Sequence, residues 1–418
     1  MPLARRLTLG DAVAIGLGSM IGAGVFAVWA PAIGVAGSGI LIALGIAAVV
    51  AYCNATSSAQ LAAAHPVAGG TYAYARAEIG PWWGFIAGWS FVIGKIASCA
   101  AMAMTFAAYA APDGWQVPVA VVAVAALAVV NCFGVTRTAL LTRVLVVCSL
   151  LGLAVTVGVG FGGVPAATPA PLPDPTAYGV LQGAGLLFFA FAGYARIATM
   201  GEEVVDPART IPRAIVLALG GAVVVYALVA LAVVLVLGAD AAESTAPLVD
   251  LLVAAGAPGL APIVRVTAAA AALGALLALL TGIGRTTLAM ARESDVPRFL
   301  AKVDERHRVP QRAEIAIAVI VIAVVLVADL RQAIGFSSFG VLLYYLIANA
   351  AAFRQTGSAR RYPRALQVLG ALGCLVLVNT LPVLASLIGT AVVVLGVAYR
   401  MLRLRLARAR RQRLDSDR

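Results

Sequence analysis

The stretch GLGSMIGAGVFAVWAP, residues 16–31, is apolar enough for a membrane, yet it carries glycine at positions 16, 18, 22 and 24. Glycine in a helix interior costs about 1 kcal/mol relative to alanine. Unwound backbone at membrane depth is tolerated only where it lies within the protein or lines a cavity. Two interpretations of this stretch alone stay open: close helix packing through small residues, and a break at a functional site.

The whole chain has the composition of an integral membrane protein. Of its 418 residues, 62% are hydrophobic and 11% charged, which excludes a soluble domain with a single core. A helix needs about 20 apolar residues to cross the hydrocarbon layer. The first segment is too long for a signal peptide and lacks a clear cleavage site, so we expect it to be retained. The sequence predicts twelve spans: 11–36, 39–63, 82–110, 117–134, 139–162, 178–201, 211–238, 260–288, 313–328, 332–353, 365–381 and 383–402.

The basic residues predict the orientation of these spans. Most of the 30 Lys and Arg residues fall at the termini and in alternate loops, so the positive-inside rule places both termini on the cytoplasmic side of the cell membrane. The net charge of +12 follows the ends of the spans rather than one face, which favours lipid headgroups over nucleic acid as the anionic partner. Residues 405–418 form a basic tail that either lies on the headgroups or only fixes topology.

Residues suited to redox or metal chemistry are scarce. The five cysteines lie within predicted spans without CxxC spacing, and the only histidines, His65 and His307, fall in predicted cytoplasmic loops. A haem, redox or metal centre would lack its usual ligands. We therefore predict that the protein is not an enzyme and uses no metal and no cofactor.

A second interruption echoes the first. Residues 188–203, FFAFAGYARIATMGEE, place Gly193 within an aromatic run of the sixth segment. Interruptions at corresponding positions of two successive sets of five helices indicate a transporter built from inverted repeats, with its substrate near the membrane midplane. Freed N–H groups of the first break can face an anion and freed carbonyls of the second a cation. An α-amino acid carries both charges on one carbon.

Five blocks of sequence support this interpretation: IGAGVF at 21–26, HPVAGGTYAYARAEIGPWWGFIAGW at 65–89, FFAFAGYARIATMGEEVVDPARTIPRA at 188–214, GRTTLAMARESDVPRFLAKVDERHRVP at 284–310 and SSFGVLLYYLIANAAAFR at 337–354. In order and spacing they resemble the amino acid–polyamine–organocation transporters. The resemblance implies an all-α membrane protein of twelve helices, with a LeuT-like five-plus-five inverted repeat over 1–353, helices 1 and 6 broken, and two further helices over 354–404. It also implies a short cytoplasmic helix after the second span.

The resemblance implies a substrate site at the two breaks. Backbone N–H groups of the first break would bind the substrate carboxylate, and carbonyls of the second its amino group. Ala23 stands where family members often carry Ser, so backbone contacts must suffice. Phe189 would close over the substrate, or else pack as an ordinary core residue. The implied substrate-binding residues are Ile21, Gly22, Ala23, Gly24, Phe189, Ala190, Ala192 and Gly193.

Two basic residues fall within predicted spans. Lys95 lies near the centre of the third, roughly 20 Å from either end, where a lysine costs roughly 2.5–3.5 kcal/mol. It either caps carbonyls of a broken helix or faces the cavity and takes part in coupling, since burial favours the neutral amine. Arg196 either forms an internal ion pair with Glu202 and Glu203 at the inner gate, or joins Lys95 in selecting an acidic substrate.

The sequence does not decide whether transport is coupled to protons or to sodium. Some proton-coupled members of the family carry a lysine on helix 5, where an ungapped comparison places Ser149. Ser149 and Thr281 would together offer hydroxyl oxygens to sodium, although isolated hydroxyls in membrane helices more often bond a carbonyl of their own helix.

The sequence therefore predicts a secondary active transporter of amino acids that works by alternating access, through proton-coupled symport or through exchange. Its partners would be a small-molecule amino acid, membrane lipids and, for symport, protons. The alternatives are an exporter or exchanger of polyamines, other organic amines or acidic amino acids, and a non-transporting amino acid sensor. A channel is disfavoured because few charged residues are available to line a pore.

Overall fold

The computed structural model describes residues 7–22, 24–65, 69–133, 139–163, 168–198, 200, 204–304, 307 and 309–416. Within these ranges the secondary structure is helical, with two isolated β-bridges in place of a sheet. The helices of the first half are α1 (Leu9–Met20), α2 (Gly24–Ala27), α3 (Trp29–Ala36), α4 (Ile40–Ala64), α5 (Thr71–Glu78), α6 (Pro81–Ala110), α7 (Gln116–Cys132) and α8 (Ala139–Gly162).

The second half also consists mainly of long helices. It comprises α9 (Ala177–Phe191), the 3₁₀ turn η2 (Ala192–Tyr194), α10 (Ala195–Ala198), α11 (Pro207–Leu237), α12 (Pro247–Ala254), α13 (Ala261–Arg292), α14 (Gln311–Val327) and α15 (Leu330–Arg354), followed by α16 (Arg364–Thr380) and α17 (Val383–Ser416). Each of the twelve predicted segments coincides with a helix or an interrupted helix. The short helix expected after the second span is α5, whereas α12 was not predicted.

Nine helices of the described chain are long and apolar enough to cross a membrane, so the chain is a multi-pass membrane protein. The helices α7 and α16 are apolar but shorter, at 17 residues each. Large apolar side chains remain exposed along α7, α8, α14, α16 and α17, as expected for surfaces that lipid covers. The arrangement of twelve spans in two inverted repeats stays a prediction.

Local sequence signals explain where several helices begin. Thr8 and Asp11 form a capping box at the start of α1: the Thr8 backbone N–H donates to Asp11 (2.9 Å) and the Asp11 N–H to the Thr8 hydroxyl (3.3 Å). Asp329 and Gln332 do the same for α15. Caps of this kind satisfy N–H groups that have no partner within the helix.

The centre of the molecule is held by small residues. The helix α6 packs extensively on α13 and α15, and its Gly94 meets Gly340 of α15. A Cβ on Gly340 would lie 2.6 Å from the Ser90 carbonyl oxygen and 2.7 Å from the Gly94 Cα, so this approach requires glycine. Close backbone approach through small residues is the usual way in which membrane helices associate.

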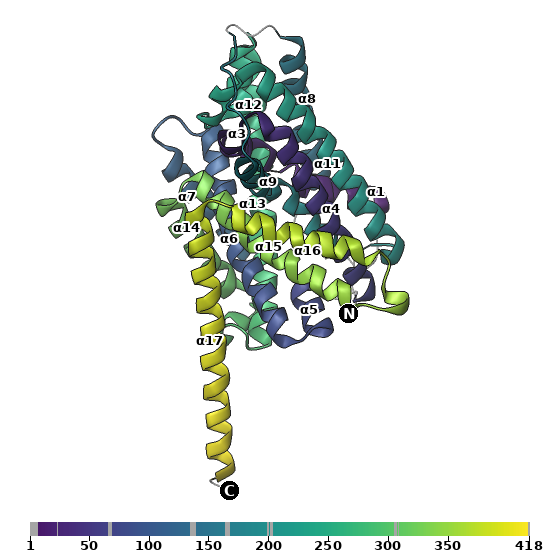
Figure 1. Cartoon of the computed structure of the whole chain (residues 1–418). Coiled ribbons are helices and arrows are strands. Elements are labelled where there is room, and N and C mark those ends of the chain that lie inside the picture. Colours follow the sequence, from purple (N-terminus) through teal and green to yellow (C-terminus); the bar gives the residue numbers. More distant parts are fainter. Residues whose placement is uncertain are drawn as a thin grey trace.

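Figure 1 shows the N-terminus and α5 toward the same end of the molecule as the far end of α17. The helix α17 runs straight past the other helices and ends at Ser416. The helix α17 thus includes the basic tail as far as Ser416, while contact of this tail with headgroups stays a prediction.

Candidate functional site

The first membrane helix is interrupted where its glycines predict. The helix α1 ends at Met20, the N–H of Ile21 caps it by donating to the Leu17 carbonyl (2.7 Å), and helical structure resumes at Gly24. Ile21 and Gly24 are buried. Ala23 lies outside the described residues, so its implied contact with a substrate carboxylate stays a prediction.

The second interruption is a tightening of the helix rather than a full unwinding. After Phe191 the chain enters the 3₁₀ turn η2, and the N–H of Ala192 donates to the Phe189 carbonyl three residues earlier. Helical structure resumes in α10 and ends at Ala198. A 3₁₀ turn inside a helix changes which carbonyls are paired, so acceptors outside the regular α-helical pattern arise without an extended stretch.

The two interruptions lie against each other. A Cβ on Gly193 would fall 2.1 Å from the Ser19 carbonyl oxygen, and a Cβ on Gly24 would fall 2.8 Å from the Ala190 Cα. Both glycines thus allow backbone of one broken helix to touch backbone of the other. Both interpretations of the opening stretch therefore apply: the helix is broken there, and the glycine at the break lets the two helices pack closely.

Tyr226 connects the two interruptions. It is not among the site residues that the sequence predicts. It lies on α11 with 1% of its surface exposed, and its hydroxyl is 2.6 Å from the Met20 carbonyl oxygen and 3.0 Å from that of Ala190. Its ring packs against Trp29 and Phe191. The available signal was a single tyrosine in an apolar helix, since a buried phenol usually has a hydrogen-bond partner.

Lys95 reaches the second interruption. It lies on α6, 6% exposed, and its Nζ is 3.5 Å from the Ala192 carbonyl oxygen. In the described part of the chain no acidic side chain forms an ion pair with it. This contact is the capping of a broken helix that the sequence left as one of two interpretations. The same carbonyl is one that the resemblance assigns to the substrate's amino group.

Arg196 does not share the environment of Lys95. Its side chain on α10 is exposed, whereas Lys95 is buried. Its predicted partners Glu202 and Glu203 lie outside the described residues, so their predicted roles in an ion pair and in a gate stay predictions. At the start of α11, Asp206 and Arg209 approach to 3.9 Å.

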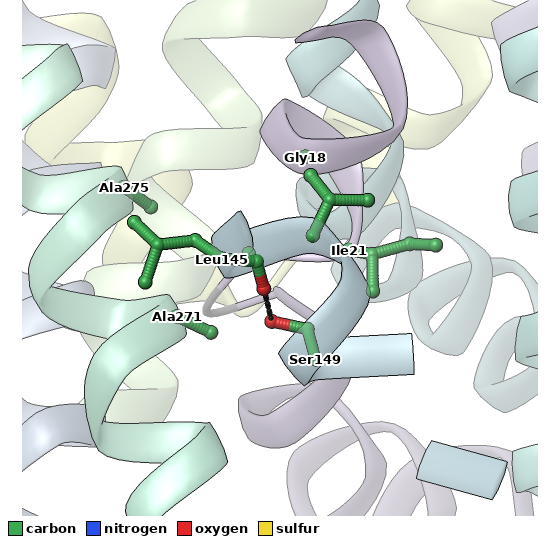
Figure 2. A pocket seen from close by; sticks show the side chains of 8 residues that line it. Gly18, Ile21, Leu145, Ser149, Ala271 and Ala275 are labelled. Atoms are coloured by element: carbon green, nitrogen blue, oxygen red, sulfur yellow. Dashed lines mark hydrogen bonds between the residues drawn. The ribbon is translucent and has the colours of Figure 1, made fainter. Parts of the chain in front are cut away.

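A small cavity of about 20 Å³ lies beside the first break, between α1, α8 and α13 (Figure 2). It has room for about one water molecule. Ser149 supplies its only side-chain hydroxyl, which donates to the Leu145 carbonyl (2.8 Å), as the dashed line in Figure 2 marks. The lining residues are Gly18, Ile21, Gly22, Leu145, Val146, Ser149, Ala271 and Ala275.

Thr281 is not part of this cavity. It follows Ala275, which lines the cavity, by six residues, or about 9 Å along a helix. Its hydroxyl is 3.1 Å from both the Leu277 carbonyl oxygen and the Asn131 side-chain oxygen. Ser149 and Thr281 each donate to a carbonyl of their own helix, and of the two only Ser149 lines the cavity. The two-hydroxyl sodium site stays a prediction.

Phe189 and Ala190 are buried near the end of α9, at 6% and 3% exposure. Of the implied residues at the second break, Ala190 and Gly193 are the ones that meet the first break, at Gly24 and Ser19. The side chain of Phe189 lies in the hydrophobic core, and its gating role stays a prediction.

A charged cluster around Asp295 ties together the end of the molecule that holds α5. The Asp295 carboxylate accepts hydrogen bonds from the Tyr72 hydroxyl (2.9 Å) and the Arg76 guanidinium (3.0 Å), and it pairs with Arg400 of α17. Arg400 also lies over the rings of Trp82 and Phe85 of α6. Burial and the neighbouring carboxylate raise the pKa of Tyr72, so its hydroxyl keeps the proton that it donates.

The chain is similar to known transporters along nearly its whole length. A protein family described as amino acid permease matches residues 11–404. An uncharacterised transporter of Mycobacterium tuberculosis is 54% identical, over 99% of this chain and 95% of its own. Cationic amino acid transporter 7 (chloroplastic) of Arabidopsis thaliana is 28% identical over 84% of this chain and 65% of its own. A branched-chain amino acid permease of Bacillus subtilis is 26% identical over 74% and 71%.

Proposed function

Because the chain belongs to the amino acid permease family, we propose that it is a secondary carrier which moves amino acids across the cell membrane by alternating access. One observation carries the proposal: the two interruptions, between α1 and α2 and at Ala192–Tyr194, lie against each other inside the bundle. Backbone groups released there are the means by which carriers built from broken helices bind small ions and zwitterions.

In this proposal the substrate carboxylate binds N–H groups of Gly22, Ala23 and Gly24. The amino group binds carbonyls at the end of α9, for which Phe189, Ala190 and Ala192 are the candidates. Substrate would then displace the local donors that now serve these carbonyls. The fold around the site would be the five-plus-five inverted repeat, followed by α16 and α17.

The names of the relatives do not agree on one class of substrate. Some refer to cationic amino acids and one to branched-chain amino acids, and transfer of either to this chain is a proposal only. The direct test is uptake of radiolabelled alanine into proteoliposomes under an imposed proton gradient, or after preloading with unlabelled amino acid. Saturable uptake supports a carrier, and the comparison of the two conditions separates symport from exchange. Absence of uptake and counterflow for a full panel of amino acids contradicts the proposal.

We propose further that Lys95 takes part in coupling. A lysine amine can carry a proton, no carboxylate of the described residues forms an ion pair with this one, and its contact with the Ala192 carbonyl would link that proton to the second break. Lys95→Ala is expected to abolish the pH dependence of uptake and to lower turnover. If the variant keeps both the turnover and the pH profile of the wild type, Lys95 has no part in coupling.

A further inference from the structure

Lys95 is held in place by its own helix. Directly before it, Gly94 packs on Gly340 of α15, where an added Cβ would lie 3.1 Å from the Gly340 Cα. Three residues after it, the Ser98 hydroxyl is 2.6 Å from that of Ser337, also on α15. These contacts fix the rotation of α6, so the side chain of Lys95 must point into the bundle at the level of the second break.

The Ala192 carbonyl, which lies near the Lys95 amine, is one of the groups that the proposed function assigns to the amino group of the substrate. At 3.5 Å from the Ala192 oxygen the contact is long for a charge-assisted hydrogen bond, and an ammonium has three protons to donate. The described surroundings supply the amine with a carbonyl and no carboxylate. The amine end of the site therefore already contains one cation whose charge is poorly compensated.

Building on the proposed function, we propose that Lys95 is a specificity-determining residue that restricts the carrier to neutral and acidic amino acids. A substrate with a cationic side chain would bring a second net positive charge to within a few ångströms of Lys95, in surroundings of low dielectric constant where repulsion is strong. A neutral amino acid adds no net charge, and an acidic one brings a carboxylate that can pair with the ammonium. Lysine, arginine and diamines are excluded by charge rather than by size.

The experiment is a competition assay in counterflow with the full-length protein in proteoliposomes. Radiolabelled alanine, leucine and glutamate are offered in turn, and leucine, glutamate, lysine, arginine and putrescine compete. In the wild type the cationic competitors are expected to be at least about 30-fold weaker than the best neutral or acidic one. Lys95→Met keeps the length and removes the charge, and it should strengthen lysine and arginine at least about tenfold relative to leucine. Lys95→Arg should keep the wild-type ranking.

The chain offers a matched control. Its one other lysine, Lys302, is exposed in a loop, so Lys302→Met should leave the ranking unchanged. If Lys95→Met folds but does not transport, the same ranking is read from the rise in its melting temperature with each ligand. If the variant does not fold, the ranking of competitors in the wild type decides whether cationic amino acids are excluded.

Lysine competing as well as leucine in the wild type, or an unchanged ranking in Lys95→Met, overturns the inference while leaving amino acid transport intact. Absence of saturable counterflow with every labelled amino acid contradicts the proposed function itself, and the inference with it.

Discussion

Tyr226 places one hydroxyl between carbonyl oxygens of the two interrupted helices. Since a phenol has a single proton, it can donate fully to only one of them at a time, and the shared geometry holds both breaks close to α11. A carbonyl buried in the bundle without its donor is costly. The residue therefore stabilises the pair of breaks as a unit.

Replacement of this hydroxyl is the sharpest test of that role. Tyr226→Phe keeps the ring contacts with Trp29 and Phe191 and removes the donor, so we expect a loss of about 1–2 kcal/mol of stability and uptake reduced several-fold. The measurements are melting temperature in detergent and initial uptake rate. Tyr178→Phe is the matched control, because Tyr178 is exposed at the start of α9. Equal behaviour of the two variants would contradict the role of Tyr226.

Gly193 allows a second test, in which one added methyl group probes the contact between the two breaks. A methyl group at this position would overlap the Ser19 carbonyl oxygen at 2.1 Å, and both partners are backbone, so the two breaks must separate. Gly193→Ala is expected to reduce uptake at least about tenfold, since forced overpacking costs about 1–3 kcal/mol or more. Gly45→Ala should be silent because its Cβ meets nothing within 4 Å. Wild-type uptake by Gly193→Ala would show that the breaks need not touch.

At the scale of elements, Asp295 joins α5 and α17 to the end of α13. Its carboxylate is 5% exposed and serves Arg76 and Arg400 together, and Arg400 is itself only 7% exposed. Removing one partner of a buried charge cluster leaves the other charges uncompensated, which costs about 3–5 kcal/mol. Asp295→Asn should therefore lower the melting temperature of the purified protein markedly.

The neighbouring carboxylate provides the control. Glu293 pairs with Arg76 at 2.8 Å but is half exposed, and pairs of that kind contribute about 0–1 kcal/mol. Glu293→Gln should hardly change the melting temperature. Similar shifts in the two variants would mean that Asp295 is not the junction of these elements.

The sequence predicts elements better than the contacts between them. Glycines mark both interruptions, because glycine is the residue that permits close approach of backbones, and apolar length marks the spans. The facing of Ser149 and Thr281 could not be predicted, since strongly apolar helices carry little periodicity to show which side meets protein and which meets lipid. The role of Tyr226 could not be predicted either, because its partners are backbone atoms of helices far away in the sequence, and no local sequence pattern indicates them.

At the scale of the whole molecule, the topology can be tested by labelling. The positive-inside rule places the tail of α17 in the cytoplasm and the turn before α7 outside. Asp113 and Gln412 are both exposed. In a variant with the five native cysteines replaced, Asp113→Cys should react with a membrane-impermeant maleimide in intact cells, and Gln412→Cys only after permeabilisation. The reverse pattern would invert the topology.

The length of α17 has a practical consequence for imaging. Its 34 residues span about 51 Å, whereas the hydrocarbon layer is about 30 Å thick, so roughly 20 Å of helix extends beyond the hydrocarbon layer. A small rigid domain joined in helical register to this end would rise above the detergent micelle as a fiducial for particle alignment. A protein that is almost entirely embedded could in this way be oriented in electron micrographs, and its inward- and outward-facing states separated by classification.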